Sequence, residues 1–349
     1  MKQSDPFTIG GTLIGAGERG NVDLPVADLY TSTSLHMPVQ VVNGRRSGPV
    51  LFISAAIHGD ELNGVEIIRR LLRLQALDKL RGTLLAVPIV NVHGFLEQSR
   101  YLPDRRDLNR SFPGSAKGSI AARLANIFLQ QIVLKANYGI DLHTGAIDRS
   151  NLPQVRANLD DARANDIALA FGAPVVINAT LREGSLRASA ADNDIPVIVY
   201  EAGEALRFDE VAIRAGLRGI LRVMRSIGML PARKRATAAH PVVARSSSWV
   251  RAPVSGIVTR RAQLGKSVRA REPLAVISDP LGSREESVSA SFDGIIIGRS
   301  NLPLAHEGDA LFHVAAFKNF ERAEDAVEEF ASIHDPALKR TVESNLKGT

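Results

Sequence analysis

The sequence of 349 residues has no cysteine, few aromatic side chains and no long hydrophobic run. The lack of cysteine excludes disulfide bonds and thiolate metal sites, and it fits a reducing compartment. The longest apolar runs are about ten residues, too short for a helix that crosses a bilayer. The segment Met1–Thr8 has no apolar region of the kind found in secretory signals. We therefore expect a cytoplasmic protein without a membrane partner.

Acidic residues are absent from one long stretch. Between Val211 and Arg271 there are 14 Lys or Arg residues and no Asp or Glu, although the net charge of the whole chain is only +6. Such a stretch can bind nucleic acid or attract anionic substrates, but charge runs are more often surface features. Trp249 is its one aromatic residue, which argues against a platform for stacking bases. We expect no nucleic-acid partner and favour pairing with the acidic segment 321–335, within the chain or in a homo-oligomer.

The pattern around residue 60 indicates a ligand site. The apolar run Pro49–Ile57 predicts a buried strand, and Asn63–Leu74 has the apolar spacing of a helix. His58 and Glu61 lie between them, at a strand end of the kind where α/β sheets bind ligands. Gly59 is expected to let the backbone turn sharply there. Two His and one Glu form a common catalytic zinc site, although acidic side chains also favour a helix N-terminus by themselves.

Two further strand ends carry residues of the same kind. Tyr138–Gly145 predicts a strand that ends near His143, and Pro196–Gly203 predicts one that ends near Glu201. Asp141 is a candidate for orienting the ring of His143. Zinc lowers the pKa of a water that it binds, and a free carboxylate such as Glu201 can then take a proton and deliver it to a leaving amine. Taken singly, this histidine and this glutamate can also be structural.

The long polar loop His93–Gly114 supplies candidate substrate contacts. Asn109 and Arg110 suit an acidic end group, because arginine binds carboxylates in a bidentate manner. A second arginine, Arg100 or Arg106, is a candidate for stabilising an oxyanion. We interpret His93, in the same region, as structural.

Four motifs in this order resemble the succinylglutamate desuccinylase/aspartoacylase family, which is part of the zinc carboxypeptidase A-like superfamily. They are His58-Gly-Asp-Glu61, Asp107-Leu-Asn-Arg-Ser-Phe112, Asp141-Leu-His-Thr-Gly145 and Tyr200-Glu-Ala-Gly203. The resemblance covers roughly residues 45–230. It implies a mixed sheet flanked by helices and a single zinc ion.

The resemblance also implies a role for individual residues. It makes His58, Glu61 and His143 the zinc ligands and Glu201 the general base. It makes Asn109 and Arg110 the pair that binds a substrate carboxylate. Leu102–Arg106 looks like extra length relative to aspartoacylase, so that both Arg100 and Arg106 stay candidates for the oxyanion position.

The order of predicted elements indicates an α/β domain, which the resemblance makes a zinc-dependent hydrolase domain, followed by a small β domain. We expect the hydrolase domain at 1–230, with a β-rich segment at 1–48 that includes a hairpin near Asn43-Gly44. A connection rich in Ala, Pro and Ser follows at 231–248, and a helical tail ends the chain at 317–349. Residues 249–316 contain an imperfect two-pass repeat and resemble a biotinyl/lipoyl-like β-barrel or sandwich. The turn Asp279–Glu286 has no lysine, so we expect no attached biotin or lipoate.

The predicted function is zinc-dependent hydrolysis of the amide bond of a small N-acyl amino acid or related N-acyl amine. Water attacks directly, since the chain has neither cysteine nor a Gly-x-Ser-x-Gly motif. One alternative is a metallocarboxypeptidase that acts on peptides, although the β domain would narrow access to the site. The other is a protein without catalytic activity that binds an anionic ligand. The sequence leaves the acyl group and the amine open.

Overall fold

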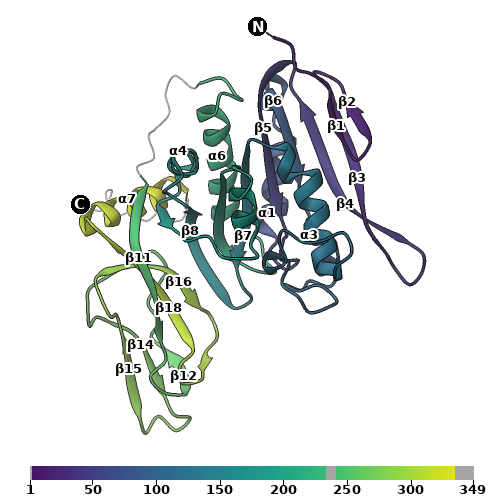
Figure 1. Ribbon diagram of the computed structural model, residues 1–349. Helices are drawn as coiled ribbons and strands as arrows, with labels where there is room; N and C mark the ends of the chain where they lie inside the picture. Colours follow the sequence, from purple (N-terminus) through teal and green to yellow (C-terminus); the bar gives the residue numbers. More distant parts are fainter. Residues whose placement is uncertain (1, 233–240, 335–349) are drawn as a thin grey trace.

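The computed structural model describes residues 2–232 and 241–334, and a mixed 12-stranded sheet runs through almost all of it (Figure 1). The strands of this sheet are, in spatial order, β13 (Ser267–Val268), β16 (Gly294–Ser300), β18 (Ala310–Phe317), β11 (Val242–Arg251), β9 (Val175–Asn178), β8 (Arg149–Ala157), β10 (Val197–Glu204), β7 (Tyr138–Gly145), β5 (Arg46–Ala55), β6 (Arg81–Val87), β4 (Ser34–Asn43) and β3 (Arg19–Asp28). A four-stranded sheet contains β15 (Glu285–Ser289), β14 (Pro273–Ser278), β12 (Gly256–Thr259) and β17 (Leu304–Ala305). A third, two-stranded sheet pairs β1 (Phe7–Ile9) with β2 (Thr12–Ile14).

Helices cover both faces of the large sheet. The seven α-helices are α1 (Asn63–Leu72), α2 (Val92–Leu96), α3 (Ile120–Gln131), α4 (Ala162–Phe171), α5 (Leu186–Ala191), α6 (Glu210–Ser226) and α7 (Phe320–His334), within the described residues. Short 3-10 helices lie at η1 (Gln75–Lys79), η2 (Leu108–Arg110) and η3 (Val133–Lys135). One core cluster joins α1, α4 and α6 to one face of the sheet, and a second joins α3 and α5 to the other face.

Helices α3, α4 and α6 each begin at a residue whose side chain caps the helix. Ser119 precedes α3 and its hydroxyl accepts a hydrogen bond from the amide of Ala122, and Asp161 and Asp209 cap α4 and α6 in the same way. Such a cap satisfies backbone N–H groups that have no partner inside the helix. Gly172 ends α4 in the left-handed conformation, with φ 74°. The apolar spacing of the sequence predicts these helices at about 118–136, 160–171 and 210–227; the last two are close to the observed bounds, and the first runs past the end of α3 into the 3-10 helix η3.

The predicted fold class is confirmed, including the small C-terminal β region. The first pass of the repeat forms β12, β13 and β14, and the second forms β16, β17 and β18. The two passes exchange their short middle strands. Strand β13 of the first pass pairs with β16 of the second, and β17 of the second pairs with β12 of the first. A third hydrophobic core cluster lies between the four-stranded sheet and the C-terminal strands of the 12-stranded sheet. The exchange explains why two weak copies of one pattern make a single β unit.

Two local expectations were wrong, and one strand was missed. The connection expected at 231–248 lies partly outside the described residues, and from Val242 onwards it is strand β11, which pairs with β9 and with β18. The hairpin expected near Asn43-Gly44 is absent because β6 lies between β4 and β5 in the sheet. Strand β8 was not predicted at all. It pairs with β10 on one side and with both β9 and β16 on the other, so the C-terminal β region is hydrogen-bonded directly to the main sheet.

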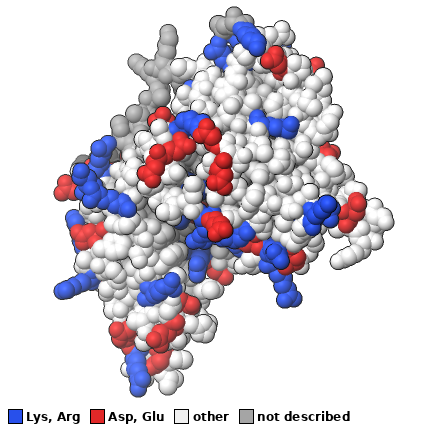
Figure 2. Space-filling model, in the orientation of Figure 1, with Lys and Arg blue, Asp and Glu red and all other residues white. Residues whose placement is uncertain are grey.

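Two arginines of the basic stretch, both on α6, form local contacts with backbone carbonyl groups. Arg214 of α6 donates to the backbone oxygen of His334 in α7 (3.1 Å), so α6 reaches the acidic helix through a carbonyl group rather than an acidic side chain. Arg222 donates to the carbonyl oxygens of Phe171 and Gly172 at the end of α4. On the face drawn in Figure 2, basic and acidic side chains are interspersed. Among the described residues, no helix has the length and apolar character needed to cross a membrane.

Candidate metal centre

The turn after β5 places His58 and Glu61 on the same side of the sheet edge. The left-handed residue of this turn is Ala56, with φ 51°, and not Gly59 as the sequence suggested. Gly59 is needed for a different reason, because a Cβ atom there would lie only 1.9 Å from the backbone carbon of Gly94 in α2. The turn is thus pressed against a neighbouring helix, and a side chain at this glycine would force the two apart.

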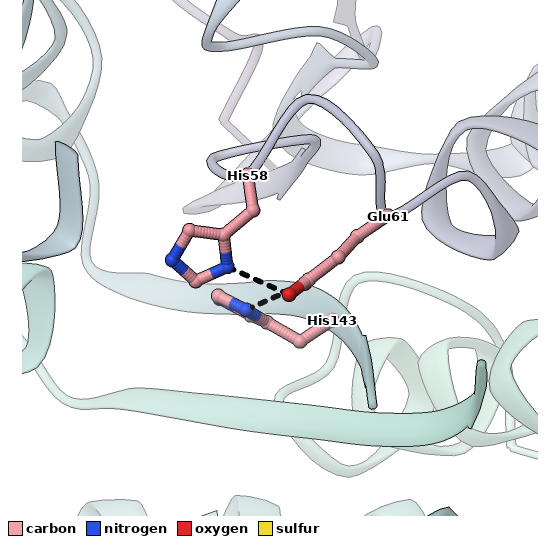
Figure 3. A group of neighbouring side chains, drawn as sticks. All are labelled: His58, Glu61 and His143. Atoms are coloured by element: carbon pink, nitrogen blue, oxygen red, sulfur yellow. Dashed lines mark hydrogen bonds and ion pairs between the residues drawn. The ribbon is translucent and has the colours of Figure 1, made fainter. Parts of the chain in front are cut away.

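His58, Glu61 and His143 converge on one buried point (Figure 3). The Nδ1 atoms of His58 and His143 lie 2.7 Å and 2.9 Å from the two carboxylate oxygens of Glu61. The three side chains are 3%, 2% and 6% exposed, in the order His58, Glu61, His143. One ligand atom from each lies within 4.8 Å of the others, so the group is able to hold a metal ion.

Neighbouring carboxylates hold both imidazole rings by the nitrogen that faces away from Glu61. Asp141 lies 2.6 Å from Nε2 of His143, as the sequence suggested, and itself accepts a hydrogen bond from Ser54. Asp107 lies 3.1 Å from Nε2 of His58. Metal-binding histidines commonly have such an acidic partner, which sets the tautomer and orients the ring. In both residues Nδ1 is left as the nitrogen for a metal.

The charges of this group also fit a cation. Burial would raise the pKa of Glu61, but the two imidazoles hold that pKa well below its ordinary value. Burial would lower the pKa of His143, but Asp141 and Glu61 outweigh it and raise that pKa well above its ordinary value. The buried carboxylates thus attract positive charge, which protons or a metal ion can supply. The donor set therefore fits a divalent metal that accepts nitrogen and oxygen ligands.

Glu201 lies next to the group but is not part of it. It is the direct partner of His143 in the parallel pairing of β10 with β7, which puts the two side chains on the same face about 4.8 Å apart along the sheet. Its carboxylate accepts a hydrogen bond from Nδ2 of Asn151 (2.8 Å) and forms an ion pair with Nε of Arg156 (3.1 Å). Glu201 thus lies beside the metal group without being one of its three ligands, and its carboxylate is held by two residues of β8.

The structure distinguishes between the two candidate arginines of the loop. Nη1 of Arg100 lies 3.2 Å from Nδ1 of His58 and 3.4 Å from Glu61, and its Nη2 donates to Asp107 at 3.0 Å. The side chain of Arg106 is 65% exposed and lies 3.8 Å from Asp104. Arg100 is therefore brought to the metal group, and Arg106 is not.

The remaining predicted pair, Asn109 and Arg110, lies in η2. Oδ1 of Asn109 accepts a hydrogen bond from the amide of Leu186 (2.9 Å), which leaves its Nδ2 as the group that can donate to a ligand. Arg110 is exposed, and one of its nitrogens donates to the backbone oxygen of Asn109. The two side chains thus start from one short helix that Asp107 caps beside His58.

Several residues at this edge were missed from the sequence. Asn151 and Arg156 come from the unpredicted strand β8, and Asp107 was quoted only as part of a motif. Arg187 of α5 lies near Glu201 and Asp141, which raise its pKa, while burial and Arg156 lower it more strongly. Only the four residues 154–157 of β8 alternate between polar and apolar, which is too short a signal to have revealed this strand.

The large sheet carries a buried His-Glu-His group at the carboxyl edge of its parallel strands. These two features place the protein in the class of α/β proteins that bind a ligand, here a candidate metal ion, at this edge of the sheet. The catalytic domain of the succinylglutamate desuccinylase/aspartoacylase family matches residues 47–227. The chain belongs to this family, and thus to a group of amide-bond hydrolases.

Individual relatives agree with this assignment. The chain is 32% identical over 167 residues to the N-alpha-acetyl-L-2,4-diaminobutyric acid deacetylase of Halomonas elongata, a match that covers 46% of this chain and 48% of the relative. The match thus spans about half the length of that curated relative. A succinylglutamate desuccinylase/aspartoacylase from Rhodobacter sphaeroides has 26% identity and a TM-score of 0.75, covering 86% of this chain and 96% of the other. The ectoine utilization protein EutE (DoeB) from Ruegeria pomeroyi shares the fold, with a TM-score of 0.77 at 22% identity over 85% and 94% of the two chains.

Proposed function

We propose that this protein is a zinc-dependent deacylase that hydrolyses the amide bond of a small N-acyl amino acid or related N-acyl amine. The observation that carries the proposal is the buried His58–Glu61–His143 group with Glu201 beside it in register on the next strand. Two histidines and one glutamate leave a coordination position open, as in other catalytic zinc sites. The intact acid beside this group argues against a protein that only binds an anionic ligand.

The roles of the side chains follow from their places around the group. A zinc ion held by the three ligands would make a water nucleophilic and polarise the substrate carbonyl. Glu201 takes the proton from the attacking water and delivers it to the leaving amine. Arg100 faces the metal ligands from the loop and stabilises the negative charge that develops on the carbonyl oxygen. Asn109 and Arg110 bind a carboxylate of the substrate.

The named substrate of the Halomonas elongata relative makes N-acetyl-L-2,4-diaminobutyrate the first compound to assay. N-acetyl-L-aspartate and N-succinyl-L-glutamate extend the panel to other acyl and amine groups. We expect the zinc-loaded protein to release free amine from at least one of these, to lose this activity with a chelator and to regain it with zinc. Release of C-terminal residues from peptides, with no hydrolysis of the panel, would instead favour the metallocarboxypeptidase alternative.

The two loop arginines give a matched pair of variants. Arg100→Met should lower kcat by about 10²- to 10³-fold, the usual effect of removing one donor to an oxyanion. Arg106→Met should stay close to the wild type because its side chain is exposed and faces Asp104 rather than the three metal-site residues. Steady-state kinetics and the zinc content of each purified variant provide the measurement. Equal kcat values for the two variants, both with full zinc, would remove the oxyanion role from Arg100.

A further inference from the structure

The sheet face beyond Glu201 contains buried polar atoms that the proposed reaction does not use. Gln154 of β8 is 0% exposed, and within the described part of the chain neither Oε1 nor Nε2 of its amide has a hydrogen-bond partner. A buried polar group without a partner destabilises the folded state, because it has lost its hydrogen bonds to water. Native proteins pair nearly all such groups, so an exception of this kind points to a partner that binds from outside the chain.

Gln154 lies directly beside Glu201. The two residues are partners in the antiparallel pairing of β8 with β10, about 4.8 Å apart along the sheet. Side chains alternate along a strand, so Gln154 and Arg156 share the face of Glu201 while Val155 points into the core cluster on the other face. Arg156 offers further N–H donors besides the Nε that faces Glu201.

The C-terminal β region supplies a third polar group to the same place. His313 of β18 is 6% exposed, its Nδ1 has no hydrogen-bond partner among the described residues, and its ring stacks on Trp249 at 4.8 Å. A Cβ atom on Gly298 of β16 would lie 3.2 Å from Cβ of His313 and 3.0 Å from Oδ1 of Asn151, the residue that binds Glu201. Because Gly298 has no side chain, His313 is able to lie close to β8, the strand whose Asn151 donates a hydrogen bond to Glu201. Burial and the nearby Arg156 lower the pKa of His313 to about 4, so its ring is neutral at pH 7.

The order of strands indicates which part of a substrate reaches this region. His143 is on β7, and β5, which leads into the turn of His58 and Glu61, lies on one side of it. Glu201 is on β10, on the other side of β7, and β8 comes next. If Arg100 faces the carbonyl oxygen and Glu201 gives a proton to the amine nitrogen, the amine part of the substrate continues past Glu201 towards β8.

We propose that Gln154, Arg156 and His313 form a subsite for the carboxylate of the amino acid that the reaction releases. This inference rests on the proposed deacylase function. The guanidinium binds the carboxylate by its free side, Nε2 of Gln154 and Nδ1 of His313 donate to it, and Oε1 of Gln154 accepts from the amine. The subsite is separate from Asn109 and Arg110, which come from the loop before α3. The C-terminal β region thereby contributes a residue to the substrate site.

Calorimetric titration of the zinc-loaded protein tests the subsite without relying on turnover. The probes are L-2,4-diaminobutyrate, L-aspartate and L-glutamate, each compared with an amine that lacks its α-carboxylate: 1,3-diaminopropane, β-alanine and 4-aminobutyrate. We expect at least one amino acid to bind at least tenfold more tightly than its counterpart. Gln154→Leu and His313→Phe should each weaken that binding at least tenfold. Both variants should melt at the wild-type temperature or above it, because they remove unpaired buried polar atoms.

His334→Phe is the matched control for the histidine variant. His334 is also buried, stacks on Phe330 at 4.2 Å and has an Nε2 without a hydrogen-bond partner in the described residues, but it belongs to α7. Its variant should bind the amino acid as the wild type does. If Gln154→Leu does not fold, His313→Phe and Arg156→Lys carry the test.

Two outcomes overturn the subsite: wild-type affinity in the variants, or a wild-type protein that binds none of the amino acids. Weakened binding in the variants, together with no hydrolysis of any N-acyl amino acid, would remove the proposed function and leave the subsite standing. The failure of one proposal is thereby distinguished from the failure of the other.

Discussion

Glu201→Gln is expected to lower kcat by about 10²- to 10⁴-fold, the usual contribution of a general base, while the protein keeps its metal. The side chain is next to His143 in the sheet but outside the group of three ligands. The amide has nearly the same shape as the carboxylate and cannot take a proton from water. Steady-state kinetics on the most active compound of the panel and the zinc content per chain provide the measurement.

Glu204 supplies the control for this experiment. It is a buried acid three residues further along β10, and its carboxylate accepts hydrogen bonds from Asp148, Ser150 and Asn301. Glu204→Gln should reduce the melting temperature, because it disturbs this network, yet leave kcat within a few-fold of the wild type. Full hydrolysis by Glu201→Gln at wild-type zinc content would show that another group takes the proton.

The predicted ligands were accessible from the sequence because each follows a short apolar strand. His58 and Glu61 follow β5, and His143 and Glu201 lie near the ends of β7 and β10. These strands are parallel neighbours, so their carboxyl ends meet at one edge of the sheet. The apolar pattern of each strand, together with the rule that α/β sheets bind ligands at the carboxyl ends of their strands, was therefore sufficient to place His58 near Glu201, more than 140 positions later in the chain.

The partners of Glu201 were not accessible in this way. Asn151 and Arg156 reach it only because β8 runs antiparallel to β10, and that pairing is set by the fold and not by any local signal. Strand β11 was hidden for a related reason. Its Ser246–Ser248 segment is polar, and its pairing with β18 supplies the stability that its own composition does not indicate. Residues that reach the site through long-range strand pairing are therefore not predicted by looking for polar residues at strand ends.

Gly59 shows a third limit of sequence reasoning. A glycine in a turn predicts a left-handed backbone, but the left-handed residue here is Ala56. The need for glycine comes from the backbone of α2, which is more than 30 residues further along the chain. A contact of this kind leaves no local trace, although the residue type itself was correctly marked as special.

His143→Ala is expected to abolish zinc binding and, with it, detectable hydrolysis. It removes one of three ligands and also leaves the buried Glu61 with a single imidazole partner, which costs further stability. In the wild type, zinc at 1,000 times its dissociation constant would stabilise the folded state by about 4.1 kcal/mol. Added zinc should therefore raise the melting temperature of the wild type and leave that of the variant unchanged.

His93→Ala is the matched control, since His93 lies in α2 beside the turn and was interpreted as structural. It is partly buried and outside the group of three ligands, so its variant should retain one zinc per chain and the zinc-dependent rise in melting temperature. Metal analysis after dialysis, together with melting curves at several zinc concentrations, separates the two histidines. Stoichiometric zinc in His143→Ala would place the metal elsewhere. The role proposed for Glu201 is to act on a water that this metal activates, so that result would also withdraw the support for a general base on β10.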